Sequence, residues 1–548
     1  MRVSGRSFFS LAVLAVIFVM IDIPVYSESI TDNNDTLKTQ EWIHLDPVDD
    51  GLAGISLNKA YQLLRDRPSK TVLVAVIDSG FDLDHEDLKD SYWTNEDEIP
   101  NNGIDDDNNG YIDDVHGWNF IGGPEENVVY DTYELTREYK RLRSKYGNNI
   151  NESDKDYDYW VEIRDEFEYK RKKSEETLLK YSEIISNIPR YYNLLLSYLD
   201  TDSLTFEAVN AIESEDTIIN QAIAQIGKLL KYFGNTVSYE TMVSVLTPAE
   251  EHYLYEVNYG YNLDYDPRSI VNDDYENKKE RYYGNNQVDD FSGMMGDHGT
   301  HVAGIIAADR ENNLGARGIA DNVKIIPLRT VPNGDERDKD VANAIYYAVN
   351  NGAKVINMSF GKHYSPERAA VEKAIRYAQK KGVLIVHAAG NDRENKDLVD
   401  NYPTRKFIKG KKEAWNVIEV GANSRYLNEN LMAKFTNYGE TSVDLFAPGV
   451  YVYSTLPNNT YKESSGTSMS APVVSGVAAL LFSYFPELSA NEVKEVILES
   501  VQNYEGEVYL PGTKELIEFP TLSVTGGILN AYEAVKIAQN KIKFRLDK

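Results

Sequence analysis

The sequence predicts an α/β fold, a doubly wound and mainly parallel sheet interrupted by a large, mainly α-helical insertion. Short continuous apolar runs are typical of strands buried on both faces of a parallel sheet. Helical patterns separate several of these runs, as a doubly wound sheet requires. The predicted strands are 71–77, 323–328, 353–358, 383–388 and 417–420, and the predicted helices between them are 301–308, 339–350 and 367–381.

Composition limits the classes of function. The 548 residues carry 87 acidic and 57 basic side chains, a formal net charge of −30, and no cysteine. Nucleic acids and anionic lipids select basic surfaces, so neither is expected as the main partner. The lack of cysteine excludes a disulfide scaffold, a cysteine nucleophile and any thiolate metal site. An apolar share of 42% is enough for a substantial core.

The amino terminus has the layout of a secretory signal peptide at residues 1–27. Arg2 and Arg6 precede an apolar run over 8–24, and 25–27 offers a cleavage site after Ser27. The alternative is an uncleaved anchor, but the run is short for a span of roughly 20 residues. We therefore expect a secreted, periplasmic or extracellular protein with no membrane contact after cleavage. Residues 28–70 form an N-terminal extension, weakly helical over 57–64.

The stretch 125–290 interrupts the strand–helix alternation. It carries 34 acidic and 19 basic residues, half of the net charge, and 21 of the 39 tyrosines. Its periodicity predicts helices over 133–146, 157–181, 184–199 and 217–232, with a break or kink at Pro189. Its leucine and tyrosine content favours a folded subdomain over a charged disordered insert. The α/β domain would then comprise 71–124 and 291–540.

Three polar residues lie where a loop meets a strand end or a helix start. Asp78 ends the first strand, His298 precedes a helix, and Ser468 precedes the apolar helix 473–482. A serine hydroxyl needs a base to become a nucleophile, and histidine titrates near neutral pH and can return the proton to the leaving group. A buried carboxylate holds such a histidine in the correct tautomer. Asn391, after strand 383–388, is a candidate donor to a developing oxyanion.

These residues stand in four motifs, taken here in chain order. They are Asp-Ser-Gly at 78–80, His-Gly-Thr-His-Val-Ala-Gly at 298–304, Ala-Ala-Gly-Asn at 388–391 and Gly-Thr-Ser-Met-Ser-Ala-Pro at 466–472. Together they resemble the subtilisin-like serine endopeptidases (subtilases, peptidase family S8) over 71–123 and 291–538. The resemblance implies a subtilisin-like sheet, with Asp78 as orienting acid, His298 as base and acid, Ser468 as nucleophile and Asn391 as oxyanion donor.

The resemblance also implies where a peptide substrate binds. Ser359, Phe360 and Gly361 would pair with its backbone as an added strand, and Ala388, Ala389 and Gly390 would line the other wall of the primary side-chain pocket. Two departures from minimal subtilisins stand out. Because of the insertion, His298 comes 220 positions after Asp78, and the 43-residue extension 28–70 is too short for the usual inhibitory prodomain.

A structural calcium ion is a further expectation. Asp105, Asp107 and Asn109 follow the 1, 3, 5 spacing of an EF-hand loop, but position 12 is His116 and not glutamate, so Asp113 or Asp114 would supply the missing carboxylate. The alternative is an acidic surface turn. Asp87 aligns with a calcium ligand of the family, with Asn312 and Asn313 near its partner loop.

The sequence therefore predicts an exported serine endopeptidase that acts on proteins or peptides. Two alternatives stay open, namely a dedicated processing protease whose insertion selects its substrates and an inactive binding module on the same fold. We expect the insertion either to shelter or extend the substrate cleft or to serve in stabilisation or partner docking.

Overall fold

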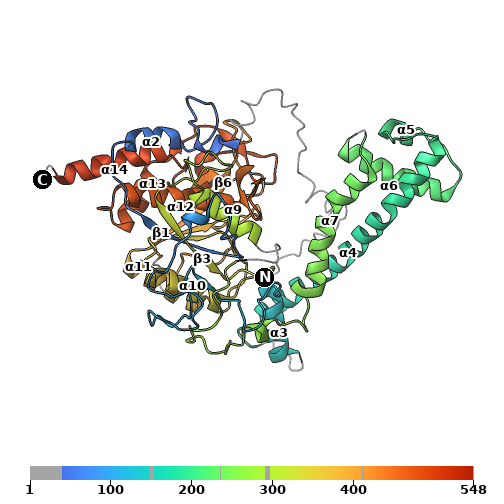
Figure 1. Ribbon diagram of the computed structural model, residues 1–548. Coiled ribbons are helices and arrows are strands. Elements are labelled where there is room, and N and C mark those ends of the chain that lie inside the picture. The colour runs from blue at the N-terminus through green and yellow to red at the C-terminus, as the bar shows by residue number, and fades with distance from the viewer. Residues whose placement is uncertain (1–39, 148–152, 235, 290–295, 410–412, 547–548) are drawn as a thin grey trace, which may run out of the picture. The chain divides into compact units, whose positions relative to one another are not determined.

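The computed structural model describes residues 40–147, 153–234, 236–289, 296–409 and 413–546 (Figure 1). The chain forms two compact units, and a nine-stranded sheet is the centre of the larger one. The strand order is β10-β13-β7-β6-β5-β4-β1-β3-β2, and every neighbouring pair is parallel except β10 with β13. The predicted α/β fold class is thereby confirmed. The strands are β1 (Val72–Asp78), β2 (Trp118–Asn119), β3 (Val323–Arg329), β4 (Val355–Met358), β5 (Leu384–Ala388), β6 (Val417–Asn423), β7 (Leu445–Pro448), β10 (Gln502–Asn503) and β13 (Gly527–Ile528).

Each face of this sheet is covered by helices. Val74 and Val76 of β1 belong to one apolar core, and Ala75 and Ile77 belong to another, because side chains alternate along a strand. The first core includes residues of α2 (Leu57–Leu64), α9 (Gly296–Ala307), α12 (Thr467–Tyr484), α13 (Ala490–Glu499) and α14 (Ala531–Leu546). The second includes residues of α10 (Asp338–Asn350) and α11 (Arg368–Lys381), which lie side by side in Figure 1. Burial on both faces explains the apolar runs of the sequence.

Smaller elements complete this unit. They are η1 (Trp42–His44), η2 (Lys89–Ser91), α8 (Arg268–Val271), the antiparallel pair β8 (Val452–Leu456) and β9 (Thr460–Ser464), the pair β11 (Glu507–Tyr509) and β12 (Leu516–Glu518), and η4 (Phe519–Leu522). Within the extension, the helix expected over 57–64 is α2, and Trp42 and Ile55 join the first core. The described part of the extension is therefore packed onto the unit that contains the sheet.

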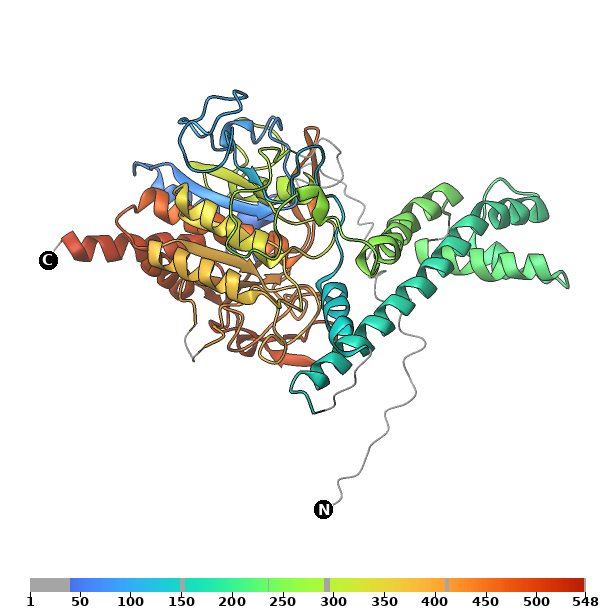
Figure 2. The same ribbon diagram turned by 90° about the horizontal axis from the view of Figure 1, so that it is seen from below.

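A second compact unit spans Arg143–Asn262. The helix α3 (Glu134–Tyr146) enters it, followed by α4 (Tyr157–Leu199), α5 (Phe206–Asn210), α6 (Thr217–Phe233), α7 (Tyr239–Tyr255) and η3 (Glu256–Gly260). Figure 2 shows α4 as one long helix. Ile188 and Leu195 of α4, Ile226 and Leu230 of α6, and Met242 of α7 form its own core. This unit contains fewer residues than the insertion that the sequence predicts at 125–290.

The expected break at Pro189 is wrong. One helix, α4, runs through the two segments predicted at 157–181 and 184–199, with Pro189 inside it. An interior proline costs roughly 3 kcal/mol of helix stability because it lacks an N–H and crowds the preceding turn. Ile188, Tyr191 and Tyr192 flank it and are buried in the core of the unit. Burial of these side chains offsets the local cost, which periodicity alone does not show.

The flanks of the insertion, 125–142 and 263–289, belong to the unit that contains the sheet. Buried ion pairs hold them there. Lys362 Nζ lies 2.7 Å from Glu134 Oε2, and Arg268 Nη1 lies 2.7 Å from Asp340 Oδ2. Both pairs join a flank to the sheet-bearing part of the chain, so part of the acidic charge of 125–290 is structural.

Residues 1–27, where the sequence predicts a signal peptide, lie outside the described residues. Within the part that the structure describes, one helix is long and apolar enough to cross a membrane, namely α12, and 94% of it is buried inside the protein. Such burial is what a central helix of a globular core shows.

Candidate active site

Asp78 and His298 meet at the carboxyl edge of the sheet. Asp78 is the last residue of β1, and His298 lies in the first turn of α9. Asp78 Oδ1 is 2.7 Å from His298 Nδ1 and accepts a 2.8 Å hydrogen bond from the Ser79 backbone N–H. The carboxylate is 2% exposed, whereas 39% of the imidazole side chain is exposed. Nε2, the other ring nitrogen, is therefore free to face a reacting group.

The charge of Asp78 decides the protonation of His298. Burial by itself lowers the pKa of His298, but the charge of Asp78 and its hydrogen bond outweigh burial, so the pKa lies above the ordinary 6.5. Stabilisation of an imidazolium is what a general base requires when it accepts a proton during the reaction.

Ser468 lies at the same edge, in the first turn of α12. Its Oγ donates a 3.0 Å hydrogen bond to the Ser359 carbonyl, and Ser359 Oγ donates to the Ser468 carbonyl at 2.8 Å. Since Ile77 of β1 pairs with Met358 of β4, Asp78 and Ser359 follow in register at neighbouring strand ends. No Ser468–His298 hydrogen bond is recorded among the described side chains. Such contacts are often long in ligand-free enzymes and shorten when substrate binds.

Two N–H donors face a common point beside Ser468. Asn391 Oδ1 accepts hydrogen bonds from the backbone N–H of Thr467 at 2.9 Å and its hydroxyl at 3.1 Å, which orients the amide. A methyl group placed on Gly466 would lie 3.6 Å from Ser468 N and 3.7 Å from Asn391 Nδ2. Both nitrogens therefore border one small space at the start of α12, where unpaired N–H groups and the helix dipole favour negative charge.

The two predicted substrate walls follow β4 and β5. Ser359–Gly361 continues β4, and Ala388 ends β5 before Ala389 and Gly390. Gly390 has a φ of +103°, and a Cβ there would lie 2.5 Å from Asn437 Nδ2, so glycine is required. The Ala389 carbonyl accepts hydrogen bonds from Asn401 Nδ2 at 3.1 Å and Asn437 Nδ2 at 2.9 Å.

Asn401, Asn437 and Thr467 are supporting residues that sequence reasoning missed. Asn401 and Asn437 are 12 and 48 residues from Ala389, in loops without a regular pattern. Thr467 could have been found from the sequence, because it stands directly before Ser468 in the motif. In the structure its hydroxyl and its backbone N–H both donate hydrogen bonds to Asn391 Oδ1. His301, by contrast, is buried and held by the Lys462 carbonyl 3.0 Å from Nε2, as expected for a structural residue.

Comparison with known proteins assigns the family. The model of the subtilase family (Peptidase_S8) matches residues 69–514, which is more than half of the chain. This chain belongs to the subtilase family. The resemblance read from the four motifs is thereby confirmed, although the roles of the individual residues stay predictions.

Three curated relatives are similar to parts of this subtilase. The thermophilic serine proteinase of Bacillus sp. (strain AK1) is 43% identical over 34% of this chain and 43% of its own length. The cell wall-associated protease of Bacillus subtilis (strain 168) is 35% identical over 47% of this chain and 28% of its own length. Subtilisin DY of Bacillus licheniformis is 36% identical over 38% of this chain and 70% of its own length. The matches to the first two relatives thus span less than half of each.

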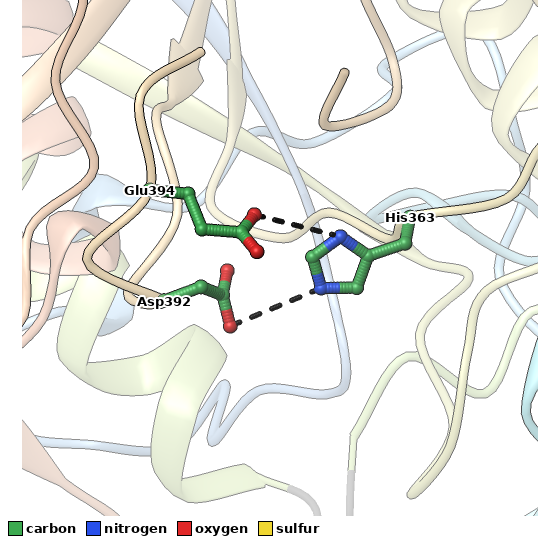
Figure 3. A group of neighbouring side chains, drawn as sticks. All are labelled: His363, Asp392 and Glu394. Atoms are coloured by element: carbon green, nitrogen blue, oxygen red, sulfur yellow. Dashed lines mark ion pairs between the residues drawn. The ribbon is translucent and has the colours of Figure 1, made fainter. Parts of the chain in front are cut away.

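The subtilase has a cluster of titratable groups next to the predicted substrate walls. His363 follows Gly361 by two residues, and Asp392 follows Asn391. His363 Nε2 lies 3.9 Å from Asp392 Oδ1, and its Nδ1 lies 3.9 Å from Glu394 Oε2, with both carboxylates on the same side of the imidazole (Figure 3). A metal ion binds one ring nitrogen and needs its other ligands around the same point. One ligand atom of each of the three residues lies within 4.8 Å of the other two, so the group could hold a metal ion.

Only some of the calcium ligands predicted at 105–114 lie close to one another in the structure. Asp105 and Asp107 lie with Glu98, and ligand oxygens of these three residues are all within 4.8 Å of one another. Glu98 was missed because it stands outside the spacing pattern. Asn109 adjoins the cluster, since its backbone N–H lies 3.0 Å from Asp105 Oδ1 and 2.9 Å from Asp107 Oδ1. Three carboxylates supply the hard oxygen ligands that calcium prefers.

Asp113, Asp114 and Asp87 bind elsewhere. Asp113 accepts hydrogen bonds from the backbone N–H groups of Asn102 and Gly103, at 3.0 and 2.9 Å. The Asp114 carboxylate is bound by Asn95, Asn109 and Tyr347, and burial raises its pKa to about 6. Asp87 accepts from Asn312 Nδ2 at 2.8 Å, so the expected loop partner lies beside it. Neither Asp113 nor Asp114 joins the Glu98 cluster.

Proposed function

We propose that this subtilase is an exported serine endopeptidase with Asp78, His298 and Ser468 as its catalytic triad. The contact between Asp78 and His298 carries the proposal. A buried carboxylate holds the Nδ1 side of a half-exposed imidazole at 2.7 Å, at the sheet edge where Ser468 lies. Export rests on the predicted signal peptide.

The proposed reaction is acyl transfer in two halves. His298 Nε2 takes the proton of Ser468 Oγ as the oxygen attacks the carbonyl carbon of the peptide bond. The Asn391 Nδ2 amide and the Ser468 backbone N–H stabilise the negative oxygen. His298 then gives its proton to the leaving amine, and the C–N bond breaks. In the second half, His298 takes a proton from water as the water oxygen attacks the acyl carbon, and it then gives this proton to Ser468 Oγ as the bond between Ser468 and the acyl carbon breaks.

The substrate would bind as an extended strand against Ser359–Gly361. The Ser359 carbonyl already accepts a hydrogen bond from Ser468 Oγ, which shows that it faces the reacting group. Main-chain pairing of this kind accepts many sequences. We therefore propose proteins or peptides as the class of substrate and do not propose a particular cleavage sequence.

Fluorophosphonate labelling tests the proposal directly. The wild-type protein is expected to become covalently labelled at Ser468, and the Ser468→Ala variant is expected to stay unlabelled. An inactive binding module would take no label in either form. Label retained in Ser468→Ala would refute the assignment of the nucleophile.

The oxyanion role of Asn391 makes a kinetic prediction. Asn391→Ala is expected to lower kcat by about 10²–10³-fold with little change in KM, a magnitude taken from subtilisin, a member of this family. The amide would act on charge that exists only in the transition state, so substrate binding is unaffected. Steady-state kinetics on a fluorogenic peptide measure both constants. A raised KM with unchanged kcat would contradict the role.

Calcium binding at Glu98, Asp105 and Asp107 is part of the proposal, and the ion would stabilise the loop. We expect excess EDTA to lower the Tm of the wild-type protein by about 5 °C if calcium is present at a hundred times its Kd. Asp105→Asn should abolish the difference in Tm between calcium and EDTA. Glu96→Gln alters an exposed carboxylate nearby and should keep it. Equal Tm values for the wild type in calcium and EDTA would refute the site.

A further inference from the structure

A buried charged cluster lies behind the proposed substrate segment, and the mechanism above does not use it. His387 of β5 and Glu419 of β6 are register partners on adjacent strands, and Lys396 comes from the loop after β5. Their exposed fractions are 0%, 2% and 5%. Charged groups are seldom this buried unless they are paired, so each of the three side chains is expected to have a charged or hydrogen-bonding partner.

Both ring nitrogens of His387 face oxygen acceptors. Nδ1 is 3.0 Å from Glu419 Oε2, and Nε2 is 2.9 Å from the Phe360 carbonyl. A neutral imidazole has one N–H and one lone pair, so either tautomer would point a lone pair at an acceptor. The doubly protonated ring satisfies both contacts.

The state of Glu419 supports this assignment. Burial raises the pKa of Glu419, but the charges of Lys396 and His387 outweigh burial and hold the pKa at about 2. Lys396 Nζ lies 2.8 Å from the same Oε2 atom that faces His387. Glu419 is therefore a carboxylate at neutral pH, and it accepts hydrogen bonds from both neighbours without donating one.

The hydrogen bond to Phe360 acts on the rear of the substrate segment. The Ser359 carbonyl faces Ser468, while the next carbonyl, that of Phe360, faces His387. Successive carbonyls of an extended chain point to opposite sides, so a donor behind Phe360 leaves the groups of Ser359 and Gly361 for an added strand.

We propose that His387, protonated on both ring nitrogens, is a positioning residue that holds the Ser359–Gly361 segment ready to pair with a peptide. It acts through the Phe360 carbonyl and touches neither substrate nor the reacting atoms. The substrate part rests on the proposed function. The protonation state does not, and the two are tested separately.

Nitrogen-15 NMR of histidine-labelled full-length protein tests the protonation state without catalysis. We expect His387 to show two protonated ring nitrogens at neutral pH, with its signals assigned by their loss in His387→Gln. A single protonated nitrogen, in either tautomer, would overturn the proposal.

Two substitutions separate the contacts of the ring. Glutamine places an amide donor near the position of Nε2 and keeps a partner for Phe360, whereas asparagine places its donor near Nδ1 and keeps a partner for Glu419. In a Ser468→Ala background, which removes cleavage, His387→Asn should weaken binding of fluorescein-labelled casein about tenfold, the effect of losing one hydrogen bond. His387→Gln should change the Kd less than twofold. Fluorescence anisotropy measures the Kd, and the Tm of each variant reports its folding.

The outcomes distinguish this inference from the proposed function. Equal Kd values for the two variants, or no casein binding in Ser468→Ala, would overturn the positioning role. If the wild type leaves casein uncut while His387→Asn weakens binding, the endopeptidase proposal fails and the positioning role stands. With an active wild type, the same rise should appear in KM and not in kcat.

Discussion

Ser468→Ala is expected to abolish peptide hydrolysis, with kcat falling by about a million-fold, a magnitude taken from subtilisin, a member of this family. The variant removes the hydroxyl that we propose as the nucleophile, and alanine offers no substitute. Ser468 is only partly buried and its hydroxyl makes one hydrogen bond, to the Ser359 carbonyl. We therefore expect the Tm to change little. Hydrolysis of a fluorogenic peptide measures the rate, and thermal unfolding measures the Tm.

Ser465→Ala is the matched control for this prediction. Ser465 is exposed, lies three residues away and accepts a hydrogen bond from the Tyr451 backbone N–H at 2.9 Å. It should leave kcat and KM close to the wild-type values. Wild-type rates in Ser468→Ala would show that another group is the nucleophile, and a large fall in Tm would show that the loss of rate is structural.

Asp78→Asn is expected to lower kcat by about 10⁴-fold and to move the pH profile. The amide of asparagine can donate a hydrogen bond to Nδ1, which favours the wrong tautomer of His298. The magnitude of the fall in kcat is taken from the same substitution in a serine protease of another fold. The base must be neutral to take a proton. In the wild type, activity should fall as the pH drops through the pKa of His298, which lies above 6.5 because the Asp78 charge outweighs burial.

Removing the Asp78 charge leaves burial, which lowers the pKa of His298. The acid limb of kcat/KM in Asp78→Asn should therefore shift to lower pH. Asp90→Asn, at an exposed position on the same unit, should change neither the rate nor the profile. An unshifted acid limb would show that His298 is not the base whose titration controls activity.

Much of the catalytic unit could be predicted from the sequence. Buried parallel strands are apolar on both faces, so β1, β3 and β5 appeared as short runs within a residue or two of their ends. The four motifs predicted residues at strand ends and helix starts, and the structure places Asp78, His298 and Ser468 there. These features are local, because backbone geometry and side-chain period determine them.

Other features could not be predicted, because they depend on which distant segments meet. Glu98 completes an acidic cluster with Asp105 and Asp107, although the loop spacing pointed to Asp113 or Asp114. Pro189 lies inside α4, where local propensity predicted a break and the core of the helical unit stabilises a continuous helix. At Pro189 packing outweighs a local preference. At Glu98 the fold of the loop brings in a carboxylate that the 1, 3, 5 spacing does not include.

The sequence by itself determined the fold class, the family and the chemical types of the candidate active site. Each of these depends on short sequence patterns that can be recognised without knowing which residues are neighbours in the fold. Only the tertiary structure decided that Asn401 and Asn437 hold the Ala389 carbonyl, and that His387 lies between Glu419 and Phe360. The physical reason is that both arrangements depend on which distant segments meet. Asn401 and Asn437 reach Ala389 from loops that the packing of the chain brings to the end of β5. His387 and Glu419 are register partners on β5 and β6, and no local pattern encodes that pairing.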